Sequence, residues 1–249
     1  IVALASVQKS RRDQGIKTVP ISLNMSFEGN PGTGKTEVAR LVARILREEG
    51  ILAVGDLIEC GRQDLVGRFV GHTAPLVHEQ FRRARGSVLF IDEAYSLVDT
   101  GNGGFGQEAI DTIIKDMEDF RDEVVVIFAG YPNELNRLFQ ANPGFPSRVS
   151  HHIGFPDYAT DELIEILQLM ASRFQLKLAG GVAERVEALV DESRGSDTFG
   201  NARFIRQLFE AALENQAIRL GPDDDPQLLL PEDFKSSEPK AQRAPFGFH

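Results

Sequence analysis

Residues 29–36 read GNPGTGKT, and this stretch decides the fold. Its spacing is G-x-x-x-x-G-K-[ST], in which glycines let the chain wrap closely around phosphate groups while backbone N–H groups point inward. An apolar stretch at 23–29 precedes it and an amphipathic stretch follows it, so the motif should join a strand to a helix. The N-terminus of that helix adds partial positive charge. We therefore predict a phosphate-binding loop between a buried strand and a helix.

The last two residues of this loop carry its chemistry. We expect the Lys35 ammonium to reach the β- and γ-phosphates of a nucleotide, and the Thr36 hydroxyl to coordinate Mg²⁺. A glycine-rich turn without a ligand is the alternative, but the complete motif in its expected context favours binding. The predicted nucleotide-binding residues of this segment are Gly29, Asn30, Pro31, Gly32, Thr33, Gly34, Lys35, Thr36 and Glu37.

A second motif, VLFIDE at 88–93, places two carboxylates directly after four apolar residues. Carboxylates at the end of a buried strand are costly unless a cation or a water needs them. We expect Asp92 to hold Mg²⁺ through water and Glu93 to polarise the attacking water. A solvated strand end is the alternative. Together the two motifs predict a nucleoside-triphosphatase that depends on Mg²⁺.

The remaining pattern indicates an α/β fold. Short apolar runs alternate with amphipathic stretches, such as the one in which Val38, Leu41, Val42, Ile45 and Leu46 follow the helical period. Near-continuous apolar strands separated by helices imply a parallel sheet covered on both faces. The expected strands are 23–29, 57–60, 87–92, 123–130 and 149–155.

Beyond residue 158 the pattern predicts only helices. The first should begin with Thr160 as its N-cap, and the others should cover 182–193 and 201–219. The acidic and polar C-terminal stretch lacks the apolar content that a packed segment needs. The predicted domains are a nucleotide-binding α/β domain (1–156), a small helical lid domain (157–234) and a disordered tail (235–249).

The composition excludes several classes of protein. Lys and Arg number 27 against 37 for Asp and Glu, and this net charge of −10 argues against a nucleic-acid partner, which calls for clustered Lys and Arg. No apolar run approaches the roughly 20 residues that span a bilayer. The single cysteine, Cys60, rules out an internal disulfide, favours a reducing, cytoplasmic compartment, and is expected in the core.

Four stretches together resemble one branch of the AAA+ ATPases: GNPGTGKT, VLFIDEAY, DLVGRFVGHTAP and NPGFPSRV. This branch contains the CbbX (CfxQ) type of red-form Rubisco activase, the stage V sporulation protein K group and the ATPases of type VII secretion. The residues of these motifs look nearest to those of the sporulation protein K group. The resemblance covers about residues 1–234. It implies ATP as the nucleotide, a five-stranded parallel sheet, a small helical lid and a ring, usually a hexamer, with ATP between subunits.

The resemblance also assigns roles to individual residues. Arg148 in PSRV fits the arginine finger, which reaches the γ-phosphate bound by a neighbouring subunit; a surface arginine that caps a helix end is the alternative. Arg203 in GNARFIR fits the sensor 2 arginine that closes the lid over the nucleotide, with Arg206 as its rival. Many members place an asparagine after the fourth strand to orient the water. Here Tyr131 has that place, and Asn133 is the alternative.

The stretch GRFVG at 67–71 resembles the loop that projects into the pore of such rings, with Phe69, Val70 and Gly71 at its tip. A flat apolar ring can grip any extended polypeptide without reading its sequence. Packing of Phe69 into its own domain is the alternative. A second pore loop at 99–106 and a plain linker there are both open.

The resemblance therefore implies a homo-oligomer, expected to be a hexamer, that uses ATP and Mg²⁺ to remodel an unknown protein partner through a central pore. A Rubisco activase of the red-form type is an alternative of the same kind. A nucleic-acid motor or loader of the same fold would need basic residues along the pore, and the acidic composition disfavours it. A scaffold that binds nucleotide only to assemble is disfavoured because all the catalytic residue types are present.

Overall fold

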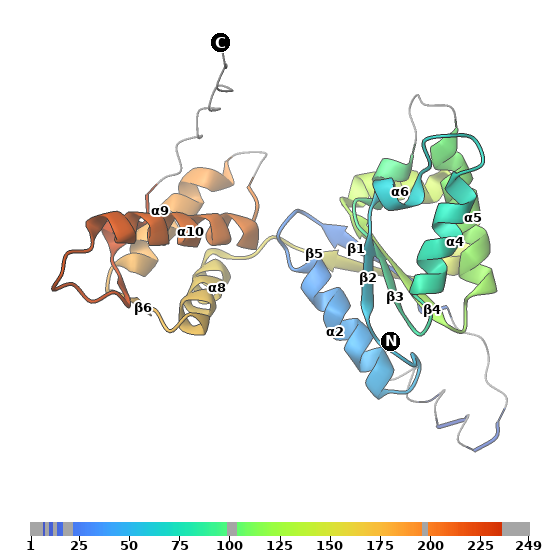
Figure 1. Cartoon of the computed structure of the whole chain (residues 1–249), viewed down its shortest axis with the longest axis horizontal. Coiled ribbons are helices and arrows are strands. Elements are labelled where there is room, and N and C mark those ends of the chain that lie inside the picture. The colour runs from blue at the N-terminus through green and yellow to red at the C-terminus, as the bar shows by residue number, and fades with distance from the viewer. Residues whose placement is uncertain are drawn as a thin grey trace, which may run out of the picture. The chain divides into compact units, whose positions relative to one another are not determined.

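The structure, a computed structural model, divides into two compact units (Figure 1). It describes residues 7, 10, 11, 14–16, 22–98, 104–195 and 199–235. The first unit contains the chain up to Asn30 and from Gly34 to Pro156, and the second contains Pro31–Thr33 and the chain from Asp157 onward. The predicted tail, apart from Lys235, lies outside the described residues.

The first unit is built on a five-stranded parallel sheet, as the sequence predicted. Its strand order is β2-β3-β4-β1-β5, and every neighbouring pair is parallel. This order places β1, which leads into the phosphate loop, between β4 and β5, so the end of β1 is flanked on both sides. The strands are β1 Met25–Gly29, β2 Leu57–Cys60, β3 Ser87–Ile91, β4 Val124–Gly130 and β5 His151–Phe155.

Helices cover both faces of this sheet (Figure 1). One face packs against α2, and the other packs against α4, α5, α6 and α7 in the larger of the unit's two apolar clusters. Cys60 belongs to this larger cluster, and burial, with Asp64 nearby, raises the pKa of its thiol to about 12. The helices are α2 Lys35–Glu48, α3 Arg62–Leu65, α4 Thr73–Arg83, α5 Phe105–Asp119, α6 Pro132–Gln140 and α7 Phe145–Arg148, with a 3₁₀ turn η1 at Ala94–Leu97.

The buried face of α2 differs from the predicted stripe. Ala39, Ala43 and Leu46 are buried, whereas Val38 and Leu41, which the helical period had placed inward, are exposed. Alanines at a spacing of four residues let the helix backbone approach the sheet closely, so they define the inner face. Leu46 lies inward as predicted, but the exposure of Val38 and Leu41 shows that the apolar period alone does not fix the orientation of the helix.

The second unit is helical, with a short sheet that the sequence did not predict. The two-residue strands β6 (Lys177–Leu178) and β7 (Leu228–Leu229) pair in parallel. The segment around β7 docks through Leu229 and Phe234, which are buried in the helical core. The helices are α8 Thr160–Arg173, α9 Val182–Arg194 and α10 Ala202–Arg219, with a 3₁₀ turn η2 at Pro231–Asp233.

The start of α8 lies one residue earlier than predicted. Ala159, not Thr160, is the N-cap, and its N–H donates to the Glu162 carboxylate at 2.7 Å. Glu162 satisfies this backbone group in the first helical turn, where a negative charge also suits the helix dipole. Within the ranges described above, no helix is long and apolar enough to cross a membrane.

Candidate nucleotide-binding and catalytic site

The phosphate loop begins where β1 ends, and its first glycine is sterically required. A Cβ at Gly29 would lie 2.3 Å from the carbonyl oxygen of Phe155 on the neighbouring strand. Gly34, the residue before α2, has a left-handed backbone (φ 87°), as does Gly32 (φ 72°). These are conformations that side chains disfavour. The loop therefore depends on glycine for both space and backbone shape.

The Lys35 ammonium is held against this loop. Its Nζ donates to the carbonyl oxygens of Gly29 at 2.8 Å and Asn30 at 2.7 Å. A cation already ordered at this place loses little conformational freedom when it meets a phosphate group. Thr36 is half-buried in the first turn of α2, and Glu37 beside it is exposed.

Asp92 and Glu93 follow β3 and are both exposed at its carboxyl end. The Asp92 N–H donates to the carbonyl of Cys60 at 3.0 Å, and the Glu93 N–H donates to Asp92 Oδ1 at 3.0 Å. Glu93 has a left-handed backbone, with φ 47° and ψ 41°. Such a conformation costs about 1–3 kcal/mol for a residue with a side chain, and it is concentrated at functional sites. The two carboxylates thus sit on a strained turn with their oxygens accessible.

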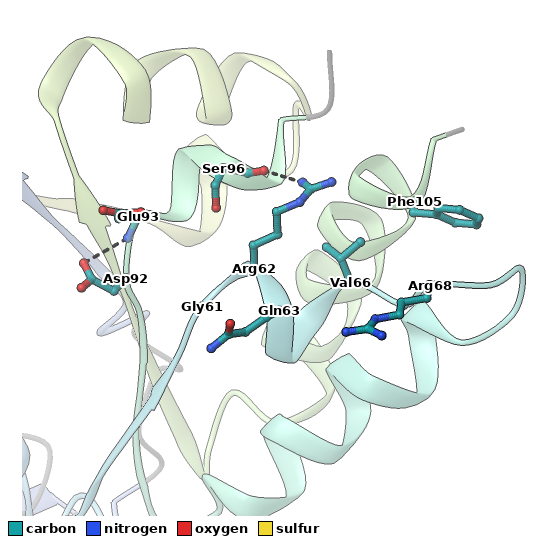
Figure 2. Close-up of a pocket in the computed structure, with 10 residues that line it drawn as sticks. Gly61, Arg62, Gln63, Val66, Arg68, Asp92, Glu93, Ser96 and Phe105 are labelled. Atoms are coloured by element: carbon teal, nitrogen blue, oxygen red, sulfur yellow. Dashed lines mark hydrogen bonds between the residues drawn. The ribbon is translucent and has the colours of Figure 1, made fainter. Parts of the chain in front are cut away.

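These carboxylates open into a pocket of about 1170 Å³ (Figure 2). Asp92 and Glu93 lie on one side of it, while Arg68 and Phe105 lie on another. Arg62 lies between these two sides, and its Nη1 donates a hydrogen bond to the carbonyl of Ser96. The pocket therefore combines accessible acids with two guanidinium groups.

A tyrosine pair stands at the end of β4. Tyr131, the N-cap of α6, is exposed, and its ring centroid lies 5.9 Å from that of Tyr95. A Cβ at Gly130 would lie 2.8 Å from Cδ1 of Tyr95, so the glycine makes room for this ring. Burial and then the nearby charge of Glu93 raise the pKa of Tyr95. The sequence reading overlooked Tyr95, although it follows the DEA segment directly.

Asn133, the alternative to Tyr131, is exposed in the first turn of α6. Tyr131, and not Asn133, is the residue in ring contact with Tyr95, whose pKa is raised by burial and then by Glu93, Tyr131 and Asp92. The assignment of Tyr131 as the water-orienting residue stays a prediction.

Arg148 ends α7 and is anchored mainly through its backbone. Its carbonyl accepts hydrogen bonds from the side chains of Ser22 and Asn24, just before β1. Its guanidinium makes longer contacts, to Glu118 Oε2 at 3.3 Å and to the carbonyl of Gly144 at 3.4 Å. The Nε atom is buried and has no hydrogen-bond partner among the described residues. The backbone of Arg148 is therefore fixed, while its guanidinium makes long hydrogen bonds, to Glu118, Gly144 and Ser147.

In the second unit, the residues Pro31–Thr33 from the tip of the phosphate loop contact the turn that starts α10. The Ala202 N–H donates to the carbonyl of Gly32 at 3.2 Å, and a Cβ at Gly32 would lie 2.0 Å from the Gly200 carbonyl oxygen. The same Cβ would lie 2.9 Å from the Arg203 nitrogen. The exposed Arg203 thus follows this contact directly, and Arg206 lies one turn further along the helix.

Asn201 organises that turn, and the sequence reading overlooked it. It is fully buried, and its positive φ of 49° with ψ −126° is a backbone conformation that residues with a side chain rarely adopt. Its Nδ2 donates to Pro31 O at 3.3 Å and Asp157 Oδ1 at 2.8 Å, and its Oδ1 accepts from the Tyr158 N–H at 3.0 Å. An Asn directly after a glycine is the signal that could have identified it.

Comparison with known proteins identifies the family. The model of the "ATPase family associated with various cellular activities (AAA)" matches residues 25–157, more than half of the chain. The chain belongs to the AAA ATPase family. The model of the AAA lid domain matches residues 159–244. The family assignment agrees with the phosphate loop, the DE pair and the sheet order.

Several curated relatives support the predicted branch. Protein CbbX of Cereibacter sphaeroides is 42% identical over 94% of this chain and 79% of its own length. Stage V sporulation protein K of Bacillus subtilis is 41% identical over 88% and 69%. A chloroplastic ribulose bisphosphate carboxylase/oxygenase activase of Cyanidioschyzon merolae is 39% identical over 98% and 83%. The branch is therefore confirmed, but these similar identities do not select a nearest member, so the sporulation protein K group stays a prediction.

The fold also matches a solved structure. The AAA domain of FIGL-1 in complex with ADP aligns with a TM-score of 0.61 at 20% identity, over 93% of this chain and 77% of that domain. This similarity confirms the predicted arrangement of a five-stranded sheet and a lid. At this level of identity it shows the fold alone.

Proposed function

We propose that this AAA protein is a Mg²⁺-dependent ATPase that assembles into a hexameric ring and pulls on a protein partner through the centre of the ring. One observation carries the proposal. The pocket that contains Asp92 and Glu93 is also lined by Gly67 and Arg68, which belong to the glycine-flanked segment Gly67–Gly71. We call this segment the exposed loop. The two carboxylates assigned to hydrolysis and the start of the exposed loop therefore line the same pocket of the first unit.

In the proposed reaction, water attacks the γ-phosphorus of ATP. The new water–phosphorus bond forms as the bond to the β-phosphate oxygen breaks, and the products are ADP and phosphate. Glu93 orients the water and takes its proton, and the Lys35 ammonium balances charge on the phosphates. Asp92 and Thr36 supply the carboxylate and hydroxyl oxygens that suit Mg²⁺, which would neutralise the phosphate oxygens.

Other residues would act on the same phosphates from further away. We assign Arg148 to the γ-phosphate of a neighbouring subunit, because its head group is loosely held while its backbone is anchored. We assign Arg203 rather than Arg206 to the nucleotide of its own subunit, because Arg203 lies beside Gly32 in the second unit. Tyr131 would orient the attacking water from the end of β4.

The exposed loop is suited to gripping a polypeptide. Phe69 is 66% exposed and Val70 is 87% exposed, so neither belongs to an apolar core. The Phe69 ring meets His72 edge-on at 5.4 Å, and the base of the loop is closed by the Gly67 N–H bond to Thr73 Oγ1 at 3.1 Å. An exposed aromatic ring on a fixed base gives contact area at low cost in side-chain entropy.

The relatives suggest a second candidate for the partner. The relative from Cyanidioschyzon merolae is named as a ribulose bisphosphate carboxylase/oxygenase activase, and it is similar over 98% of this chain. Reactivation of that carboxylase is therefore a specific form of the proposed remodelling. Measuring carboxylase activity with and without this protein and ATP tests it.

The proposed reaction is tested by the Glu93→Gln variant. A glutamine keeps the shape of the side chain but takes up no proton, so ATP should bind while phosphate release falls by about 10²- to 10⁴-fold. Phosphate release, nucleotide binding and particle mass with and without ATP are the three measurements. Turnover at the wild-type rate, or a particle that stays monomeric with ATP, would contradict the proposal.

A further inference from the structure

A continuous series of hydrogen bonds connects Glu93 with the exposed loop. The Ser96 N–H donates to the Glu93 carbonyl at 2.8 Å. The Arg62 guanidinium donates to the Ser96 carbonyl (Figure 2), and the Val66 N–H donates to the Arg62 carbonyl at 2.9 Å. The residue after Val66 is Gly67, where the exposed loop begins. Arg62 is the side-chain link in a series that is otherwise backbone.

At each end of this series, at Glu93 and in the exposed loop, the backbone is able to change conformation. Glu93 holds a left-handed backbone that a residue with a side chain rarely adopts. At the other end, Gly71 has φ 80°, and a Cβ there would meet no described atom within 4 Å. Between them, α3 is four residues long and is fixed by the buried Leu65. If the backbone turn at Glu93 changes, the short helix α3 can therefore shift as a unit and move the start of the exposed loop.

We propose that Arg62 is a positioning residue that couples the nucleotide state sensed at Glu93 to the exposed loop. The inference rests on the proposed function, because it needs ATP at Glu93 and a working loop. A guanidinium bound to a carbonyl makes a stronger link than a neutral donor. Coupling is reciprocal, so a polypeptide on the loop must change ATP affinity by the factor by which ATP changes polypeptide affinity.

Arg68 provides a matched control for Arg62. It lines the same pocket and carries the same charge. Among the described residues, however, the hydrogen bond to the Ser96 carbonyl comes from Arg62. Replacing either arginine by methionine removes one positive charge from the pocket and keeps an apolar stem of similar length. A difference between the two variants therefore reports the contacts that Arg62 makes, the bond to Ser96 among them, rather than the loss of a positive charge.

The chain contains no tryptophan, which allows a single fluorescent reporter. Val70→Trp places it on the exposed loop beside the unchanged Phe69, and Glu93→Gln keeps ATP intact. The experiment records tryptophan emission of this double variant on addition of Mg-ATP, with ATP binding measured in parallel. We expect ATP to shift the emission, Arg62→Met to remove most of the shift without loss of ATP binding, and Arg68→Met to retain it.

A conservative variant and a second readout complete the test. Arg62→Lys keeps a cationic donor and should retain more of the shift than Arg62→Met. With an unfolded polypeptide as probe, the effect of ATP on its affinity, about 5- to 150-fold for a typical coupling, should fall toward onefold in Arg62→Met. An equal shift in Arg62→Met and the parent, or an equal loss in Arg68→Met, would overturn the inference. If the Val70→Trp/Glu93→Gln protein with Arg62 intact shows no emission shift on addition of ATP, then nucleotide does not move the exposed loop. The proposed function then fails at that step, independently of Arg62.

Discussion

A side chain added at Gly29 would place its Cβ 2.3 Å from the Phe155 carbonyl oxygen, whereas one added at Gly71 would meet no described atom within 4 Å. Both glycines belong to loops that we assign to function, but their surroundings are opposite. The first glycine of the phosphate loop is packed against a neighbouring strand of the sheet. The exposed loop holds Phe69 and Val70 in solvent. The comparison fits the proposed roles, in which the first loop binds a nucleotide and the second contacts the protein partner.

The largest effect should come from a residue outside both loops. Arg148→Ala removes the cation assigned to the neighbour's γ-phosphate, so ATP turnover should fall by about 10³-fold or more while ATP still binds. The decisive control mixes Arg148→Ala subunits with Glu93→Gln subunits, whose arginines are intact. Phosphate release should return in the mixture, since an intact Arg148 can serve a site that retains Glu93. Failure of the mixture to recover any turnover in jointly assembled rings would show that Arg148 acts within its own subunit.

The two glycines themselves give a paired prediction. Gly29→Ala forces the overlap with Phe155, and the strands must shift, so the free energy of unfolding should fall by about 3 kcal/mol or more and ATP binding should be lost. In Gly71→Ala the added Cβ meets open space, so the free energy of unfolding should fall by only about 1 kcal/mol, the cost of a left-handed backbone. Chemical denaturation of both variants measures the difference. Equal losses of stability would contradict the contrast between the two loops.

A smaller effect concerns α4 and α5, where α4 follows the exposed loop in the chain. His78 Nδ1 lies 2.6 Å from Asp116 Oδ2 across these helices, and Asp116 Oδ1 is buried with no hydrogen-bond partner among the described residues. Burial raises the pKa of Asp116, although the hydrogen bond with His78 opposes the shift. The folded state therefore binds this proton more tightly than the unfolded state.

The sign of the pH dependence follows from that difference. Between the ordinary pKa of an aspartate and its raised value, the folded state carries more of this proton, so the stability contribution falls as pH rises. Asparagine does not titrate, so Asp116→Asn should not lose stability in this way. The free energy of unfolding of Asp116→Asn relative to wild type should therefore increase as pH rises through the range between the two pKa values. Denaturation at a series of pH values checks the difference between the two proteins. A constant difference over the window would contradict a raised pKa.

The sequence predicted the architecture well because apolar strands and a phosphate-loop motif leave few alternatives. All five strands of the large sheet lie within or at the predicted ranges. It misjudged the inner face of α2, where the small Ala39 and Ala43 rather than the larger Val38 and Leu41 face the sheet. It also could not predict β6 and β7, because two-residue strands carry no detectable period.

The site was predictable to the extent that its residues are local in sequence. Lys35, Asp92 and Glu93 lie in compact motifs, and the structure places Asp92 and Glu93 in a pocket with part of the exposed loop. The link from Arg62 to Ser96 joins residues 34 positions apart through a backbone carbonyl, which has no residue-type signature. Tyr95 and Asn201 lie inside quoted motifs, but their contacts with Tyr131 and with Pro31 and Asp157 are long-range and could not be predicted from the sequence.

The central claim is that the exposed loop, driven by ATP, holds a polypeptide through Phe69. The most direct measurement compares Glu93→Gln with Glu93→Gln/Phe69→Ala in ATP, using a labelled and permanently unfolded polypeptide as the probe. An exposed aromatic anchor should dominate such a contact, so the second variant should bind the probe at least about tenfold more weakly, with unchanged ATP affinity. Equal affinity of the two variants for the probe would contradict the account.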